Sequence, residues 1–261
     1  MFKQIKDAGI RKTSAESGDC LVLQNPTTSE TYNIIKADFL KGLLSDNTVQ
    51  PTTLLLLHGE GANNGTSIID SSAFNRTAAR VGNPVTSTAQ KKYNSSSMYF
   101  DGASNIAFPS SSELDLKRNN FAIQCWIYPT SISGTKIILD RYSSTVPFSW
   151  QFGLNSGKLN FYIRSSDASG SLISLVGDTT LAINTWYYVG VKCINGIISL
   201  WVNGEIDALG LGSANLSSSL VLTVGKQGNV NSFYYQGYID ELKFSKKGDV
   251  DLSTIPTQAF S

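Results

Sequence analysis

The chain has 261 residues, of which 41% are hydrophobic and only 16% charged, and it contains 22 glycines; this profile favours a turn-rich β protein over a helical one. The formal net charge of +1, with Lys and Arg spread along the chain, excludes electrostatic capture of nucleic acid or of an anionic membrane. No run of about 18 apolar residues occurs and the N-terminus lacks the apolar centre of a signal peptide, so we expect neither membrane insertion nor export by that route.

Residues 1–50 differ in pattern from the rest of the chain. A turn at Gly18-Asp19 precedes the apolar run 20–24, and a second turn leads into a returning run over 30–36, which together predict a β-hairpin. Apolar residues at helical spacing predict a short helix over 37–44. A unit this small cannot bury enough apolar surface to stand alone, so we expect it to dock onto the β domain, sister copies or a larger assembly.

The polar stretch 45–53 marks a predicted boundary between an N-terminal module (1–50) and a larger domain (51–261). Beyond it, short strands recur at a spacing of roughly ten residues, which predicts an all-β, two-sheet antiparallel jelly-roll sandwich. Asn-Gly-type hairpin turns are predicted because Asn and Gly tolerate positive φ. These turns are at Asn155-Ser156-Gly157, Asn195-Gly196 and Asn203-Gly204. The expected strands include 53–57, 135–141, 150–154, 158–164, 171–176, 186–193, 197–202, 221–225 and 237–244.

The stretch 98–130 carries the clearest strand pattern. Met98-Tyr99-Phe100 leads into Asp101-Gly102, after which we expect the strand to resume over 106–108. Residues 121–128 are apolar at nearly every position, which is typical of a strand covered on both faces in the middle of a sandwich.

Two segments resemble known families. Residues 17–43, SGDCLVLQNPTTSETYNIIKADFLKGL, are similar to a short module of phage tail and fibre proteins. From about Thr53 to Asp251 the motifs LLLLHGEG, MYFDG, FAIQCWIYPT, NTWYYVGVKCINGIISLWVNGE and YYQGYIDELKFSKKG resemble, in order and spacing, a laminin-G-like domain. This is the concanavalin-A-like jelly roll, in the variant common in phage structural proteins.

The resemblance implies a non-enzymatic bacteriophage virion protein: a tail fibre, a head fibre or a capsid decoration. Residues 1–50 would attach it to other capsid or tail proteins, and the jelly roll, as a homotrimer, would contact host-surface glycan. One alternative is a purely structural cement protein that binds no sugar. Another is a glycan-active enzyme or free lectin of the same fold.

Some relatives of this jelly roll are glycosidases, so paired acids on a strand would be candidate catalytic residues. Glu113 and Asp115 begin the required alternation of acids on one strand, but the next positions are Lys117 and Arg118, so we expect no catalytic pair there. His58, the single histidine, follows a buried strand and opens a Gly-rich loop, and we interpret it as a hydrogen-bonded structural residue.

Asp101 and Asp240 are the candidate metal ligands. They occupy the motifs Phe-Asp-Gly and Ile-Asp-Glu, and jelly rolls of this superfamily often hold calcium with such an aspartate and nearby carbonyls. The competing interpretation is that each carboxylate accepts backbone N–H bonds at a turn.

Aromatic side chains at strand ends and in loops are the candidate ligand contacts, because a sugar ring can stack on them and loops carry function. They are Tyr142, Trp150, Tyr234 and Tyr235, with Phe148 and Phe233 beside them. Alternatively, residues 233–235 pack against a neighbouring subunit. Trp126, Trp186 and Trp201 fall within strand motifs and are expected to serve packing.

Overall fold

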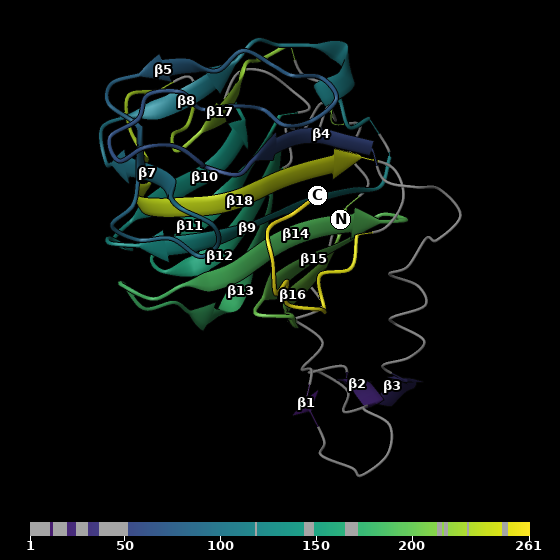
Figure 1. Cartoon of the computed structure of the whole chain (residues 1–261). Coiled ribbons are helices and arrows are strands. Elements are labelled where there is room, and N and C mark those ends of the chain that lie inside the picture. The colour runs from purple at the N-terminus through teal and green to yellow at the C-terminus, as the bar shows by residue number, and fades with distance from the viewer. Residues whose placement is uncertain are drawn as a thin grey trace.

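The described part of the chain is an all-β sandwich of two antiparallel sheets, as predicted (Figure 1). The computed structural model describes the backbone of residues 11–12, 20–24 and 31–36. It then describes residues 52–261 except 118, 144–148, 165–171, 213–215, 217–218, 229 and 247–249. Within these residues no helix has the length or the apolar character needed to cross a membrane.

One sheet has seven strands in the order β13-β12-β11-β10-β17-β8-β5. Their bounds are Leu172–Thr180 (β13), Lys158–Arg164 (β12), Trp150–Asn155 (β11), Thr135–Arg141 (β10), Leu222–Val224 (β17), Asn105–Phe108 (β8) and Ala79–Val81 (β5). Every neighbouring pair is antiparallel.

The other sheet has eight strands, in the order β16-β15-β14-β9-β18-β7-β6 with β4 also paired to β18. Their bounds are Glu205–Leu211 (β16), Ile197–Val202 (β15), Tyr187–Ile194 (β14), Phe121–Pro129 (β9), Gln236–Lys246 (β18), Ser97–Asp101 (β7), Val85–Ser87 (β6) and Thr52–Leu57 (β4). The strands β5, β6 and β16 were not expected from the sequence. The described helical structure is one short 3₁₀ turn, Ser112–Leu114 (η2).

The predicted N-terminal hairpin is present in the backbone pairing. Strand β2 (Cys20–Gln24) runs antiparallel to β3 (Thr31–Lys36), and the short β1 (Arg11–Lys12) pairs with β2. The helix expected over 37–44 and most of the boundary at 45–53 lie outside the described residues. Both the helix and the division into two domains therefore stay predictions.

All three predicted hairpin turns are confirmed. Each is a two-residue turn whose two residues both have positive φ, for example 51° at Asn195 and 82° at Gly196 between the paired Ile194 and Ile197. The turns after β11 and β15 repeat this geometry. A turn of this kind matches the right-handed twist of the strands that it joins, so it fixes the register of each hairpin.

Residues 98–108 differ from the prediction of one interrupted strand. The run 97–101 is β7 of the eight-stranded sheet, whereas 105–108 is β8 of the seven-stranded sheet. Asp101 accepts a hydrogen bond from the Ala103 N–H (2.9 Å) and Gly102 has a φ of 86°, so the chain turns here and crosses to the other layer. The alternation continues on both sides of the turn because each strand covers the same core.

The main core lies between the sheets, and a second apolar cluster covers the outside of the eight-stranded sheet. The central strand β9 contributes to both: Ile123 and Ile127 face the main core, and Trp126 belongs to the outer cluster with Tyr188 and Leu252. The C-terminal segment, yellow in Figure 1, passes over this side of the sheet and supplies Leu252. The prediction that 121–128 is covered on both faces is thus confirmed.

Candidate functional site

A row of polar side chains crosses the outer face of the seven-stranded sheet. In register across neighbouring strands, Thr223 lies opposite Asp140, Asp140 opposite Gln151, and Gln151 opposite Tyr162. The residues before and after Asp140, Leu139 and Arg141, point to the other side of the sheet with the core residues. Directly opposite side chains on antiparallel strands have Cβ atoms roughly 5 Å apart, so these four side chains form one continuous row.

Asp140 is the buried centre of the polar row. Its Oδ2 accepts the N–H groups of Gly228 (2.9 Å) and Tyr142 (3.1 Å), whereas its Oδ1 has no hydrogen-bond partner. Burial raises the pKa of this carboxyl to about 7, and the two N–H bonds and the charge of Lys226 only partly oppose that rise. A perturbed carboxyl with an open oxygen is typical of a functional site, because a purely structural one would be satisfied.

Gln151, beside Asp140, repeats this feature. Its Oε1 is also buried without a partner. The next position, Tyr162, is half-buried, and its ring meets that of Tyr142 edge-on with centroids 5.8 Å apart. Burial raises the pKa of the Tyr142 hydroxyl, so this hydroxyl remains a hydrogen-bond donor throughout the physiological pH range.

The other end of the polar row is held by the turn after β17. Thr223 donates its hydroxyl to the carbonyl of Lys226 (2.8 Å), and the Lys226 ammonium lies 5.6 Å from the centre of the half-buried Tyr234 ring. Two of the predicted ligand contacts, Tyr142 and Tyr234, therefore flank the polar row.

The structure corrects two of the predicted ligand contacts, Trp150 and Tyr235. Both are fully buried (0% exposed) in the main core, where Trp150 packs against Phe161 and Phe244 and Tyr235 packs against Phe100. Neither ring can face a ligand as placed. Trp126 and Trp201 are buried in the outer cluster and Trp186 is partly buried against it, as their packing role required. Phe233 is 44% exposed, and Phe148 lies outside the described residues.

The predicted calcium pair is not brought together. Asp101 lies opposite Gln236 at one end of the β7–β18 ladder, and Asp240 is four residues farther along β18, roughly 13 Å away. Both carboxylates bind backbone N–H groups, Asp101 that of Ala103 and Asp240 those of Lys92 (2.7 Å) and Tyr93 (3.1 Å). Asp240 keeps one buried oxygen without a partner. The described residues hold no cluster of three or more metal-binding side chains. Calcium binding thus stays a prediction for Asp240 alone.

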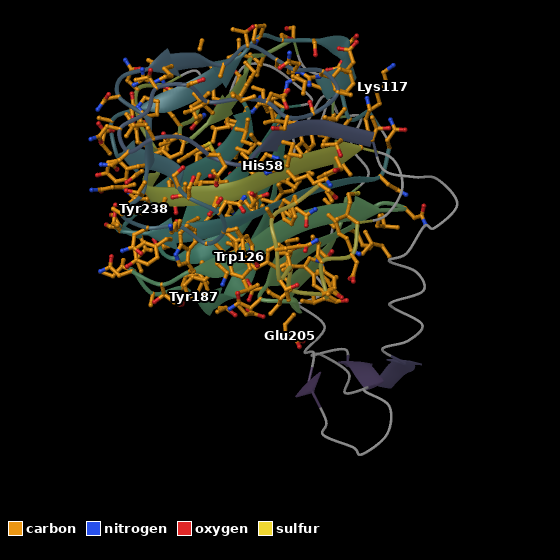
Figure 2. The ribbon with its side chains drawn as sticks, viewed as in Figure 1. His58, Lys117, Trp126, Tyr187, Glu205 and Tyr238 are labelled. Atoms are coloured by element: carbon orange, nitrogen blue, oxygen red, sulfur yellow. The ribbon has the colours of Figure 1, made fainter. Side chains whose placement is uncertain are left out.

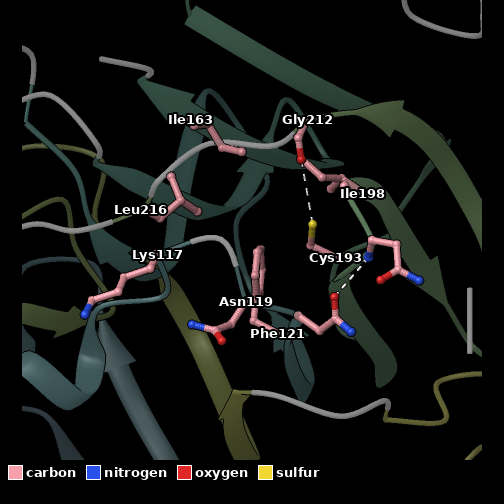
Figure 3. A pocket seen from close by; sticks show the side chains of 11 residues that line it. Lys117, Asn119, Phe121, Ile163, Cys193, Ile198, Gly212 and Leu216 are labelled. Atoms are coloured by element: carbon pink, nitrogen blue, oxygen red, sulfur yellow. Dashed lines mark hydrogen bonds between the residues drawn. The ribbon is translucent and has the colours of Figure 1, made fainter. Parts of the chain in front are cut away.

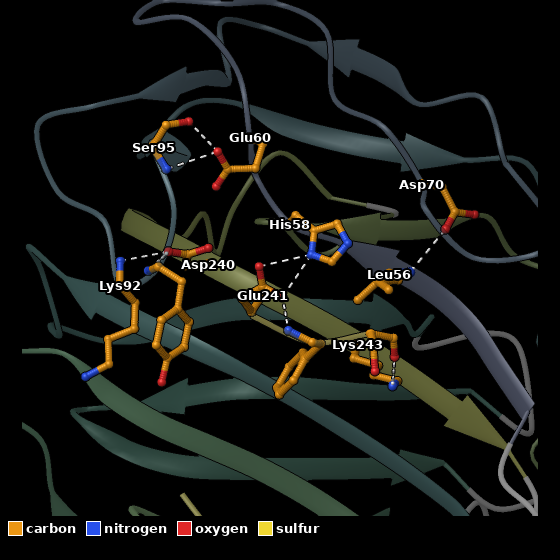
Figure 4. A network of polar contacts seen from close by, with 12 residues as sticks. Leu56, His58, Glu60, Asp70, Lys92, Ser95, Asp240, Glu241 and Lys243 are labelled. Carbon is orange, nitrogen blue, oxygen red and sulfur yellow. Dashed lines mark hydrogen bonds and ion pairs between the residues drawn. The ribbon is translucent and has the colours of Figure 1, made fainter. Parts of the chain in front are cut away.

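His58 has the hydrogen bond expected of a structural histidine. Its Nδ1 lies 2.9 Å from the buried carboxylate of Glu241, which also accepts the Phe260 N–H (2.8 Å; Figure 4). Glu241 occupies a bulge of β18 with a φ of 53°, so its side chain is turned under the C-terminal segment. This network fastens that segment to the sheet.

Glu113 and Asp115 lie in different environments. Glu113 is exposed in the 3₁₀ turn, whereas Asp115 forms an ion pair with the buried Arg141 (3.1 Å). One carboxylate therefore faces solvent and the other is held by a buried guanidinium.

A pocket of about 170 Å³ opens at one end of the sandwich (Figure 3). Its floor is apolar, with Phe121 and Leu216, and its rim carries amides. Asn119 donates to the Leu116 carbonyl, and Asn120 accepts the Asn195 N–H. Because these amides hold the surrounding loops, the polar row, with its unsatisfied oxygens, is the better candidate for a binding site.

Comparison with known proteins identifies the family. A family model described as the concanavalin A-like lectin/glucanases superfamily (Laminin_G_3) matches residues 100–247, more than half of the chain. The chain belongs to this superfamily. The laminin-G-like resemblance of the sequence is thereby confirmed. No curated protein matches the chain.

Solved structures of the same fold include toxin and enzyme domains. The binding domain of Paraclostridial Mosquitocidal Protein 1 has a TM-score of 0.62 at 13% identity over 77% of this chain and 51% of that chain. Domain 4 of AbnA, a GH43 extracellular arabinanase from Geobacillus stearothermophilus solved with arabinotriose, has a TM-score of 0.60 at 12% identity over 78% and 97%. The binding domain of botulinum neurotoxin serotype G has a TM-score of 0.59 at 14% identity over 77% and 50%. The concanavalin A-like chain spans about half the length of the two toxin binding domains, and at these identities the likeness shows the fold alone.

Asp140 and Gln151 were not among the predicted site residues. Each stands in a strand beside core residues, and a single polar residue in such a strand is ordinary. The signal lies in the pairing of β10 with β11, which the sequence does not specify until the register is known.

Proposed function

We propose that this protein is a non-enzymatic carbohydrate-binding sandwich displayed on a bacteriophage particle, with the polar row of the seven-stranded sheet as its glycan site. The observation that carries the proposal is the pair of buried oxygens without partners, Asp140 Oδ1 and Gln151 Oε1, on adjacent positions between half-buried tyrosines. Leaving each acceptor unsatisfied costs about 1–3 kcal/mol; because both side chains are buried, a bridging water held between them and a ligand hydroxyl would remove that cost.

Sugars have the chemistry that this surface requires. Their hydroxyl groups donate hydrogen bonds, which Asp140 and Gln151 can accept through such a bridging water. Their C–H faces can lie on the rings of Tyr142, Tyr162 and Tyr234, which combine an apolar body with a polar tip. The absence of charge excess in the chain favours a hydroxyl-rich ligand over a polyanion.

The polar row supports binding without hydrolysis. Glycosidases of this chemistry use two carboxyl groups about 5–9.5 Å apart, one on each side of the scissile bond. Asp140 is the single carboxylate of the polar row, because its neighbours across the strands are Gln151 and Thr223.

The display on a virion rests on the resemblance of residues 17–43 to a phage tail and fibre module. The glycan part is supported by the fold neighbours, since AbnA domain 4 was solved with arabinotriose and the binding domain of botulinum neurotoxin DC with SialylT. In the proposed arrangement residues 1–50 attach a homotrimer to capsid or tail proteins, and the sandwich faces the host. Immunogold labelling of purified particles tests the location, and light scattering after size exclusion tests the trimer.

A glycan array probed with the full chain tests the binding site. We expect binding to one class of host-surface polysaccharide, with the affinity lowered about three- to tenfold by Gln151→Ala and similarly by Tyr162→Ala, because each change removes one hydrogen-bonding or stacking group. Glu205→Gln, an exposed residue of the other sheet, is the matched control. Binding that is unaffected by both polar-row variants would place the glycan elsewhere. Reducing-sugar release from a bound polysaccharide would contradict the non-enzymatic part.

A further inference from the structure

Four aromatic side chains form a second row, on the outer face of the eight-stranded sheet. Tyr238 lies directly opposite Tyr99 on one side and Tyr128 on the other, and the ring of Trp186 contacts that of Tyr128. The ring centroids follow one another at 4.9 Å (Tyr99–Tyr238), 5.8 Å (Tyr238–Tyr128) and 5.5 Å (Tyr128–Trp186). These residues are named the aromatic row below.

Packing against the hydrophobic clusters accounts only for the Trp186 end of the aromatic row. All four side chains are half-buried, and Tyr99, Tyr128 and Tyr238 belong to neither hydrophobic cluster. The C-terminal segment packs on the neighbouring Trp126 through Leu252, and these three tyrosines are not part of that cluster. Figure 2 shows Tyr238, Trp126 and Tyr187 on the same side of the molecule. The half-buried rings therefore lie along a line that crosses β7, β18 and β9 and ends at Trp186, the residue before β14.

The surroundings of the aromatic row are polar. One step along the strands, on the same side of the sheet, the exposed Asp101 lies opposite the half-buried Gln236. The aromatic row, bordered by carboxylate and amide groups, suits a ligand in which C–H faces alternate with hydroxyl groups. A protein interface of this size would instead have a continuous apolar centre.

We infer that the aromatic row is a second carbohydrate-binding surface, which takes an extended polysaccharide chain rather than a single sugar. Three strand spacings of about 4.8 Å separate its first and last rings, so the aromatic row is roughly 14 Å long. A single sugar ring would cover only part of that length. The inference shares with the proposed function only the class of ligand, since the two surfaces lie on opposite faces of the sandwich and act independently.

The alternative is that the rings stabilise the sheet through cross-strand pairing, which contributes a few tenths to about one kcal/mol for each pair. Stability and binding must therefore be measured on the same variants. Tyr238→Ala interrupts the aromatic row at its centre, whereas Tyr99→Ala shortens it at the end next to the edge strand β6, where the structural cost is smaller. Tyr238→Phe keeps the ring and is the conservative control.

The experiment is affinity gel electrophoresis of the full chain in gels containing arabinan, xylan, dextran or a bacterial capsular polysaccharide, with thermal unfolding of each variant. We expect Tyr238→Ala to weaken retention about three- to tenfold for the polysaccharide that binds, Tyr99→Ala to weaken it less, and Tyr238→Phe to stay near wild type. Binding of the matching trisaccharide, measured by calorimetry, should depend on Tyr162 of the polar row and not on Tyr238.

The outcomes separate the two proposals. Retention unchanged by Tyr238→Ala and by Tyr99→Ala, in folded variants, overturns the inference; if Tyr162→Ala weakens binding in the same series, the proposed function stands. Retention lost in Tyr238→Ala, with trisaccharide binding unaffected by Tyr162→Ala, overturns the polar row as the glycan site and keeps the inference. A wild-type chain that none of the four polysaccharides retains overturns the aromatic row as a polysaccharide surface.

Discussion

Replacing Asp140 by Asn should stabilise the fold at neutral and alkaline pH. Burial raises the pKa of this carboxyl from 3.8 to about 7, so between these pH values the folded protein holds a proton that the unfolded chain has released. The free energy of unfolding therefore falls as pH rises from about 4 to about 7, and the loss is complete above pH 7. The difference between the pKa values of the unfolded and folded states corresponds to a loss of at most ~4 kcal/mol in the free energy of unfolding. The amide of Asn keeps the shape and cannot ionise.

Urea unfolding followed by tryptophan fluorescence between pH 4 and pH 8 measures this effect. We expect Asp140→Asn to be more stable than wild type by about 2–4 kcal/mol at pH 8, a shift of roughly 1–2 M in the urea midpoint, and within about 1 kcal/mol at pH 4. Glu205→Gln removes one exposed carboxylate and should leave the pH dependence unchanged. Parallel curves for Asp140→Asn and wild type would show that Asp140 is ionised at little cost, and the reasoning on its open oxygen would fail.

Three further expectations concern packing and metal binding. Trp150→Ala should lower the free energy of unfolding in urea by about 3–5 kcal/mol, because it empties the centre of the main core. Tyr142→Ala at the surface should lower it by less than about 1 kcal/mol. Equal effects would contradict the assignment of Trp150 to the core. Leu252→Ala should loosen the C-terminal segment and shift Trp126 fluorescence to the red, and an unchanged spectrum would show that the segment covers the sheet without it. If Asp240 binds calcium, the melting temperature should rise with calcium and fall again with chelator, and Asp240→Asn should abolish the rise; no shift in wild type rejects the site.

Local chemistry determined what could be predicted about the fold. The three hairpin turns follow from Asn and Gly alone, because both residues of such a turn need positive φ. The continuous apolar run 121–128 identified a strand covered on both faces, although only the structure shows that the outer cover is the C-terminal segment. The edge strands β5 and β6 are three residues long, which is too short to show a period of two.

The features that could not be predicted depend on strand register and on side-chain burial, which are known only from the structure. Met98 to Phe108 alternates as one strand would, yet a turn at Gly102 sends its two halves to different sheets, because both halves face one core. Trp150 begins a strand after a loop, which suggested exposure, but its register against Arg141 places it on the inner face. Asp140 and Gln151 become a candidate site only once β10 and β11 are paired, and neither residue signals that pairing by itself.

The buried carboxylate of Asp140, with its open oxygen, could serve the fold or a ligand. The Asp140→Asn variant distinguishes these two explanations. If the carboxylate served the fold, Asn would remove a charge-assisted bond to two N–H groups and weaken the protein. If it is kept for a ligand, the same change should strengthen the fold at pH 8 while it replaces an acceptor by a donor toward the glycan. A variant that is more stable and binds polysaccharide less tightly would therefore assign the cost of this buried acid to ligand binding, and a variant that loses both would assign it to structure.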